Sequence, residues 1–98
     1  MNKKSELLKL FSPHLFWSVD KDKLDTDRHK EYIIENVMNY GLEKDEFLLY
    51  QIYPHRVLRK ILPRLDSLNE AATAYSSAVF NIKETKFKCY AKKLSHVN

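Results

Sequence analysis

The chain has 98 residues, of which 44% are apolar and 31% are charged, and its formal net charge is +4 at pH 7. This length predicts one domain, and five Phe, six Tyr and one Trp supply bulky core residues. The chain has a single glycine. Glycine-rich phosphate-binding loops and dinucleotide-binding turns need several glycines, because their backbone must approach phosphate closely. Most classes of phosphate-binding enzyme are therefore not expected.

The cysteine count and the N-terminal segment favour the cytoplasm. Cys89 is the only cysteine and has no partner for an internal disulfide. Glu6 and Lys9 interrupt the apolar residues near the N-terminus, which disfavours a secretion signal. The longest uncharged stretches, 10–19 and 71–82, are shorter than the roughly 18 apolar residues needed to span a bilayer. We expect a cytoplasmic protein without a membrane segment.

Positive charge is concentrated in the C-terminal half of the chain. Residues 1–53 contain eight Lys and Arg against ten Asp and Glu, whereas residues 54–98 contain nine against three. Such a basic field favours an anionic partner, which can be a nucleic acid, an acidic protein face or a membrane surface. The alternative is a lysine-rich surface that serves solubility.

The N-terminal part predicts a short helix followed by an extended segment. Apolar residues favour a helix from about Lys4 to Phe11, which ends because Pro13 follows. Residues 12–20 are too irregular for a helix and too aromatic for a solvated loop. We expect them to lie over the helices as a strap anchored by Trp17, with Leu15, Phe16 and Val19.

The clearest helical pattern covers about Thr26 to Tyr40. Its apolar arc includes Ile33, Ile34 and Val37, and either Asp25 or Thr26 can cap its first turn. Gly41 stands where a left-handed residue would end the helix in a Schellman motif, with Leu42 against Val37.

Two short helices separated by Pro54 follow. The first covers about Lys44 to Ile52 and is expected to bury Phe47, Leu48 and Ile52. Pro54 breaks the chain because it has no N–H and clashes with the preceding turn. The second covers about His55 to Leu62 and separates into an apolar face and a basic face, the latter made of Arg56, Arg59 and Lys60. Pro63 ends it, and Arg64 extends the basic cluster.

The last predicted helix begins at a capping box formed by Ser67 and Glu70 and runs to about Phe80. Phe80 falls outside its apolar arc, which contains Leu68, Ala71, Ala72, Tyr75, Ala78, Val79 and Ile82. Residues 83–90 alternate briefly, which favours a short strand or an extended return across the core. We expect the ends, 1–11 and 91–98, to be mobile.

These elements predict an all-α fold, in which about five short helices form one domain over residues 1–98. The pair of helices around Pro54 is similar to a helix-turn-helix, which lays its second helix in a DNA groove. Six cations are therefore candidates for binding a nucleic acid or another anionic partner: Arg56, Arg59, Lys60, Arg64, Lys86 and Lys88. A helical hairpin whose basic face is simply exposed to solvent would give the same sequence pattern.

Other residues give weaker signals. The histidines and Cys89 do not have the spacing of a zinc site, so we expect no metal and no cofactor. His29 is expected to be partly buried and hydrogen-bonded, and Cys89 to be a small core residue rather than a reactive thiol. Phe80 and Tyr53 are candidates for a protein interface, although packing in the core is the default. His55 beside Arg56 leaves a small nuclease as a remote alternative, because no paired acid and base is visible.

Three strings carry a resemblance to a family: SPHLFWSVDKDKLD, HKEYIIENVMNYG and NIKETKFKCY. From about Leu10 to Tyr90 the chain resembles a family of small, uncharacterised bacterial domains. Members have a tyrosine-glycine pair where Tyr53 and Pro54 stand here. The resemblance implies a partner of a nucleotidyltransferase-type abortive-infection toxin, beside which members are encoded. It assigns no catalytic residue. The expected function is thus a non-enzymatic, antitoxin-like or regulatory binding module, and the alternative is a DNA- or RNA-binding regulator.

Overall fold

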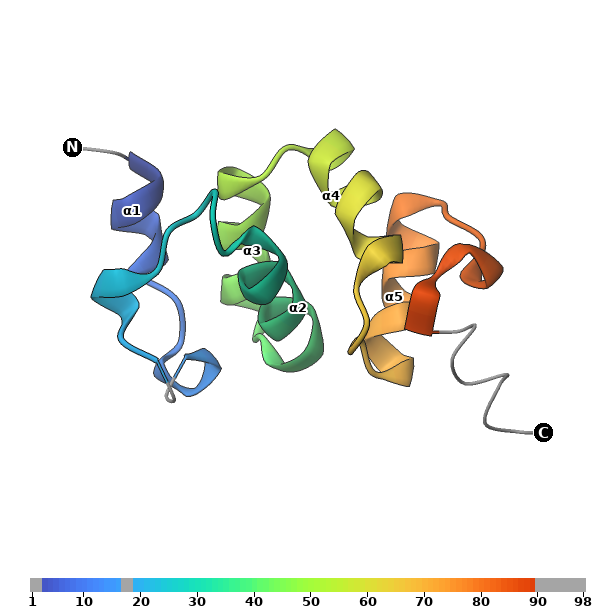
Figure 1. Ribbon diagram of the computed structural model, residues 1–98, viewed down its shortest axis with the longest axis horizontal. Helices are drawn as coiled ribbons and strands as arrows, with labels where there is room; N and C mark the ends of the chain where they lie inside the picture. Colours follow the sequence, from blue (N-terminus) through green and yellow to red (C-terminus); the bar gives the residue numbers. More distant parts are fainter. Residues whose placement is uncertain (1–2, 17–18, 90–98) are drawn as a thin grey trace.

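The computed structural model describes residues 3–16 and 19–89, and this part of the chain is all helical, with no strand (Figure 1). Its α-helices are α1 (Lys3–Leu8), α2 (Lys30–Tyr40), α3 (Glu43–Ile52), α4 (His55–Ile61) and α5 (Glu70–Phe80). Short 3-10 helices lie between or after them: η1 (Pro13–Leu15), η2 (Lys21–Lys23), η3 (Leu62–Arg64) and η4 (Glu84–Lys86). The prediction of a small all-α bundle is confirmed.

The helices are arranged along an elongated body with extents of 48 × 27 × 23 Å. α1 and α2 both pack against α3, while α2 also contacts α5. Figure 1 shows α1 at one end of the molecule and α4 and α5 at the other. One buried apolar cluster connects these elements, from Leu8 and Phe11 through Ile33 and Leu49 to Phe87. None of the described helices is long and apolar enough to cross a membrane.

Two residues of the N-terminal segment lie in the core, whereas residues 1 and 2, the start of the segment that we expected to be mobile, lie outside the described residues. Leu8 and Phe11 are each only 2% exposed, and α1 lies against α3. The predicted strap is partly helical, because Pro13 begins η1, but Leu15 and Phe16 are buried as expected. Trp17, its predicted anchor, lies outside the described residues, and Val19 is exposed.

α2 begins at Lys30 because the residues before it form a separate turn. The carboxylate of Asp25 accepts hydrogen bonds from the N–H groups of Asp27 (2.8 Å) and Arg28 (2.9 Å). These two bonds hold the pKa of Asp25 below its usual value. His29 is partly buried, and its Nδ1 accepts the N–H of Asp25 at 2.9 Å, which confirms the prediction of a satisfied histidine.

The predicted left-handed ending of α2 at Gly41 is wrong. Gly41 is extended, with φ −71° and ψ 150°, and Leu42 is exposed rather than packed on Val37. The Gly41 N–H still bonds to the carbonyl of Val37 at 2.8 Å, and the chain then leads directly into α3. Glycine is needed for space: a Cβ at this position would lie 2.5 Å from the Val37 oxygen.

α3 buries part of the predicted face: Ile52 is buried and Leu48 is partly buried against the core, as expected. Asp45, Leu49 and Ile52 face the core, whereas Phe47 is 66% exposed. The prediction that Phe47 points inward is therefore wrong. The inward face instead includes Asp45, whose carboxylate accepts two hydrogen bonds from Ser12 of the N-terminal segment.

α5 also differs from its predicted arc. Its N-cap is Asn69, whose Oδ1 accepts the N–H of Ala72 at 2.7 Å, so the predicted capping box at Ser67 is wrong. The helix buries small and hydroxylated residues together with Phe80: Ala72, Thr73, Ser76 and Phe80. Tyr75 and Val79, predicted to face inward, are 45% and 43% exposed.

The chain after α5 turns back without forming the predicted strand. Residues 84–86 form η4, Phe87 is buried, and residues 88 and 89 are helical. Cys89 packs against the core cluster, and its sulfur lies 3.1 Å from the hydroxyl of Thr73, as expected for a core cysteine. Tyr90 and the predicted mobile tail, 91–98, lie outside the described residues.

Candidate functional site

α4 and the chain after α5 line an open surface depression of about 670 Å³, which we call the basic groove. Five lysines and arginines line it, and no Asp or Glu does. The complete lining is Arg56, Arg59, Lys60, Pro63, Asn81, Ile82, Lys83 and Lys86. Like charges that share one surface depression add up to a positive potential there.

The first wall of the basic groove is the outer face of α4. Pro54 precedes the helix in an extended conformation, and Leu58 and Ile61 are buried on its inner side. Since residues on opposite faces of a short helix are fixed relative to each other, this burial places Arg56, Arg59 and Lys60 on the exposed side.

The second wall is set by a left-handed residue at the end of α5. Asn81 has φ 55° and ψ 53°, and the N–H of Ile82 then donates to the carbonyl of Ser77 at 3.0 Å. These are the features of a Schellman ending. The turn sends the chain back, and η4 follows, so Lys83 and Lys86 come to line the hollow opposite α4.

Arg59 joins the two walls. Its Nε donates a hydrogen bond of 3.0 Å to the carbonyl oxygen of Phe80, the last residue of α5. That carbonyl belongs to the negative end of the α5 dipole, where a cation is favourable. The bond uses one of five guanidinium N–H groups. The guanidinium of Arg59 is thus held at the junction between α4 and α5.

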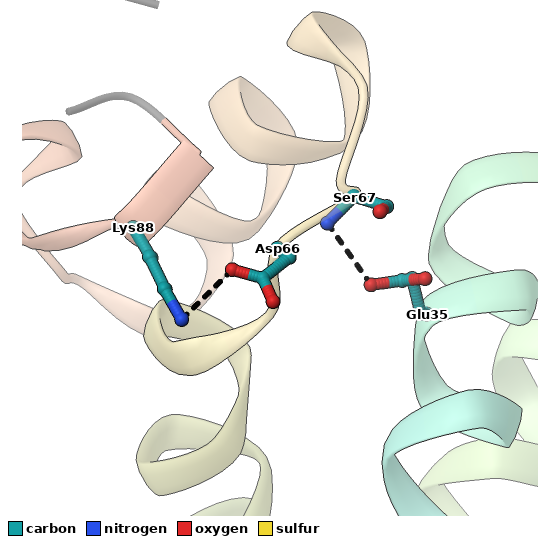
Figure 2. A network of polar contacts seen from close by, with 4 residues as sticks. All are labelled: Glu35, Asp66, Ser67 and Lys88. Atoms are coloured by element: carbon teal, nitrogen blue, oxygen red, sulfur yellow. Dashed lines mark hydrogen bonds and ion pairs between the residues drawn. The ribbon is translucent and has the colours of Figure 1, made fainter. Parts of the chain in front are cut away.

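The structure gathers four of the six predicted cations in the basic groove: Arg56, Arg59, Lys60 and Lys86. Arg64 is exposed and does not line it. Lys88 points to Asp66 and forms an ion pair of 2.9 Å with it (Figure 2). The loop that carries Asp66 is tied to α2, since the Ser67 N–H donates to Glu35 at 3.1 Å (Figure 2).

Sequence reasoning missed Lys83 as a groove residue. The signal was present, because an asparagine followed by an apolar residue, Asn81 and Ile82, is typical of a helix ending in a left-handed residue. Recognising that ending would have predicted that the chain reverses and brings Lys83 toward α4.

A smaller hollow of about 250 Å³ lies beside the basic groove, and we call it the aromatic pocket. Its lining is Tyr50, Tyr53, His55, Leu58, Val79 and Phe80. The ring of His55 is 4.8 Å from that of Phe80, and the ring of Tyr50 meets Phe80 edge-on at 6.1 Å. Tyr50 is 37% exposed and His55 is exposed.

The buried aromatics of this pocket correct one prediction. Tyr53 is 4% exposed and Phe80 is 2% exposed, so the alternative in which they form an exposed protein interface is wrong. Tyr53 is held inside because its hydroxyl donates to the carbonyl of Thr26 at 2.6 Å. Burial, together with the charges of Asp27 and Asp25, raises the pKa of Tyr53.

Glu46 fixes the orientation of Tyr50. The hydroxyls of Tyr50 and Tyr75 both donate to the same oxygen of the Glu46 carboxylate. Burial and this hydrogen bond raise the pKa of Tyr50. The Tyr50 ring is therefore presented to the aromatic pocket in a fixed position.

A third depression, open and of about 550 Å³, is lined by Leu10, which follows α1, and by residues of α3, and we call it the apolar hollow. Leu10, Phe47 and Leu48 line it together with Glu43 and Lys44. Leu10 is 59% exposed and Phe47 is 66% exposed. Large exposed apolar side chains that share one hollow are typical of protein interfaces.

No group of three or more His, Cys, Asp or Glu side chains that could hold a metal ion occurs among residues 3–16 and 19–89. Nε2 of His14 is hydrogen-bonded to the carbonyl oxygen of Tyr40, and Nδ1 of His29 accepts the N–H of Asp25. The ring of His55 lies against that of Phe80. These histidines are accounted for by structural contacts.

Comparison with known proteins gives a match to one family model. No curated protein and no solved structure matches the chain. A model described as "Family of unknown function (DUF6922)" matches residues 11–62, a range that includes α2, α3, α4 and the first wall of the basic groove, but not α5 or the second wall. The match is shorter than the range from Leu10 to Tyr90 that carried the resemblance. Since it covers more than half of the chain, the protein belongs to this family, DUF6922.

Proposed function

We propose that the protein is a non-catalytic binding module that holds the phosphate backbone of a nucleic acid in the basic groove. The observation that carries this proposal is the placement of five cations on two facing walls, with no carboxylate in the lining. Lysine and arginine that neutralise phosphates release condensed counterions, which supplies most of the free energy of sequence-independent binding. The groove offers five such cations to the phosphates of a strand.

The lining favours a nucleic acid over an acidic protein face. Centres of protein interfaces are enriched in aromatic residues and depleted of lysine. The basic groove has no aromatic residue, and its only apolar side chains are Pro63 and Ile82. Interfaces with nucleic acids are more polar and much more positive, and the basic groove fits that description.

The same lining supports binding rather than cleavage. Phosphodiester hydrolysis needs a general acid and a general base within reach of the scissile bond. Among the described residues, no Asp, Glu, His or Cys lines the basic groove. His55, the residue of the nuclease alternative, lies in the neighbouring aromatic pocket against Phe80.

The test compares charge reversal at two lysines that are two positions apart. Lys86 lines the basic groove, whereas Lys88 is paired with Asp66 outside it. We expect Lys86→Glu to weaken binding to a fluorescent oligonucleotide at least tenfold, measured by anisotropy at low salt, and Lys88→Glu to have a much smaller effect. Binding of the unmodified protein should weaken steeply with salt. Undetectable binding at low salt, or equal effects of the two variants, would refute the proposal.

A second function is supported by the apolar hollow: an antitoxin-like contact with a protein. The resemblance implies a nucleotidyltransferase-type toxin as partner, and exposed Leu10 and Phe47 provide apolar area for such a contact. None of the residues that line the apolar hollow lines the basic groove or the aromatic pocket. A regulator with separate sites can hold a toxin and a nucleic acid at once.

Co-purification with the nucleotidyltransferase-type toxin of the same host tests this second function. We expect Phe47→Gln to abolish the complex, because it removes apolar area from the hollow. Tyr40→Gln is the matched control, since Tyr40 is 61% exposed but does not line the hollow. A complex that survives Phe47→Gln, or no complex with the unmodified protein, would reject the function.

A further inference from the structure

We propose that the aromatic pocket receives a nucleobase, so that the protein prefers single-stranded nucleic acid to a duplex. This inference rests on the proposed function, because the phosphates of the same strand lie in the basic groove. The inference adds a ligand, a nucleobase, for the aromatic pocket, which is separate from the basic groove. It also specifies that the nucleic acid is single-stranded.

The first argument is that the aromatic pocket and the basic groove adjoin along two elements. On α4, His55 lines the pocket and the next residue, Arg56, lines the groove. At the end of α5, Phe80 lines the pocket and Asn81 lines the groove. The hydrogen bond from Arg59 to the Phe80 carbonyl lies on this boundary. In a nucleotide only the sugar separates base from phosphate, so one nucleotide can occupy both hollows.

The second argument is the chemistry of the pocket lining. Its two exposed rings, Tyr50 and His55, both contact the buried ring of Phe80. Proteins bind single strands by stacking bases on such rings beside a positive groove, and the preference for sequence is weak because every base has a π face. Leu58 and Val79 provide aliphatic sides. The lining therefore suits the face and edges of a flat heteroaromatic ring.

The third argument is size. The aromatic pocket has a volume of about 250 Å³, below the roughly 300–1,000 Å³ of sites that enclose whole drug-sized ligands. It therefore takes one ring system, while the charged remainder of the ligand stays outside. The fixed orientation of Tyr50, set by its bond to Glu46, lowers the entropy lost when a base stacks on it.

The fourth argument is that a duplex fits this surface poorly. α4 has only seven residues, and its cations line one depression together with Lys83 and Lys86 from the chain after α5. A helix that reads DNA must enter the major groove. In a duplex the bases are also paired and stacked, and turning one out costs a few kcal/mol. A single strand presents its bases without that cost.

Fluorescence anisotropy with probes of equal length tests the inference on the full chain. The probes are a single DNA strand, a single RNA strand, a DNA duplex, and an abasic strand that has the phosphates but no bases. We expect both base-bearing single strands to bind about tenfold more tightly than the duplex and the abasic strand. Equal affinity for all four probes would overturn the inference.

A variant series separates stacking from charge. His55 is exposed, so His55→Ala should fold, and we expect it to weaken binding of the base-bearing strands about tenfold while leaving the abasic strand unchanged. His55→Phe should restore binding, because it restores an aromatic face. Tyr40→Ala, an exposed tyrosine outside the pocket, is the control. Unchanged strand binding by His55→Ala would refute the inference.

The two proposals fail in different ways. If Lys86→Glu weakens all probes equally and His55→Ala weakens none, the basic groove binds phosphates but the aromatic pocket takes no base. If no probe binds at low salt, or if polyglutamate binds as tightly as the strands, the proposed function falls together with the inference.

Discussion

Ser12 and Asp45 are 33 residues apart in sequence and are joined by two hydrogen bonds in the core. The N–H of Ser12 donates to Oδ1 of Asp45 and the hydroxyl of Ser12 donates to Oδ2, both at 2.8 Å. Asp45 also accepts the N–H of Leu42 at 2.8 Å, which caps the start of α3. The carboxylate is fully buried, so one side chain fastens the N-terminal segment and α3 together.

Replacing Asp45 should destabilise the fold strongly. In Asp45→Ala the N–H groups of Ser12 and Leu42 lose their acceptor, and each buried, unsatisfied polar group costs about 1–3 kcal/mol. We expect the free energy of unfolding, measured by urea denaturation, to fall by about 3 kcal/mol or more. Glu43→Ala, at an exposed position of the same helix, is the control and should have little effect. A loss below about 1 kcal/mol for Asp45→Ala would contradict this account.

The same carboxylate makes stability depend on acid. Burial raises the pKa of Asp45, but hydrogen bonds from Leu42 and Ser12 outweigh burial and hold it below the usual value. The folded protein therefore binds this proton more weakly than the unfolded chain. The resulting stabilisation is present above the unfolded pKa, about 3.9, and is lost as pH falls through the folded pKa.

Asp45→Asn isolates this effect, because asparagine does not titrate. We expect the difference in unfolding free energy between the original protein and the variant to be constant at neutral pH and to shrink below about pH 4. Asp25, whose pKa is also lowered, is present in both proteins and cancels in the difference. A difference that stays constant down to pH 2 would show that Asp45 does not titrate with folding.

Local signals in the sequence predicted that helices end near Tyr40 and Phe80 and that α4 begins after Pro54, but they did not predict which way each helix faces. Pro54 marked the start of α4, and the apolar arc of α4 correctly left Arg56 and Lys60 exposed. The inward face of α3 was mistaken because Asp45 is buried by a bond to Ser12, and no local pattern reveals a partner that far away. Asp45, which the apolar pattern leaves out, is buried, whereas Phe47 is exposed.

α5 shows the same limit. Its inward face is rotated by about one residue from the apolar arc, since Thr73 and Ser76 are buried and Tyr75 is not. Thr73 satisfies its hydroxyl within the helix by donating to the carbonyl of Asn69 at 2.9 Å, which lets it face the core. Tyr75 instead reaches out to Glu46. The same limit applies to the prediction of the basic groove, because the position of its second wall depends on how α5 ends.

Gly41 is predicted to be irreplaceable for steric reasons. Its φ of −71° is open to any residue, so alanine would lose nothing in backbone conformation. Its Cβ, however, would lie 2.5 Å from the Val37 carbonyl oxygen and 3.2 Å from Cβ of Asp45, between α2 and α3. We expect Gly41→Ala to lower the unfolding free energy by about 1–3 kcal/mol. Leu42→Ala, at an exposed neighbour, is the control. Equal stability of the Gly41 variant would mean that α2 and α3 can separate freely at this junction.

Arg59 and Arg56 should respond differently to lysine, although both line the basic groove. Arg59→Lys keeps the positive charge but removes Nε, the atom that donates to the Phe80 carbonyl at the boundary with the aromatic pocket. Lysine cannot reproduce a guanidinium held in this planar geometry. We therefore expect Arg59→Lys to weaken binding of a single strand several-fold and to reduce its advantage over the abasic strand, whereas Arg56→Lys should change neither by more than about twofold. Anisotropy with the two strands at one salt concentration measures both effects. If the two variants behave alike, the bond from Arg59 to Phe80 does not position the strand, and charge alone governs binding in the groove.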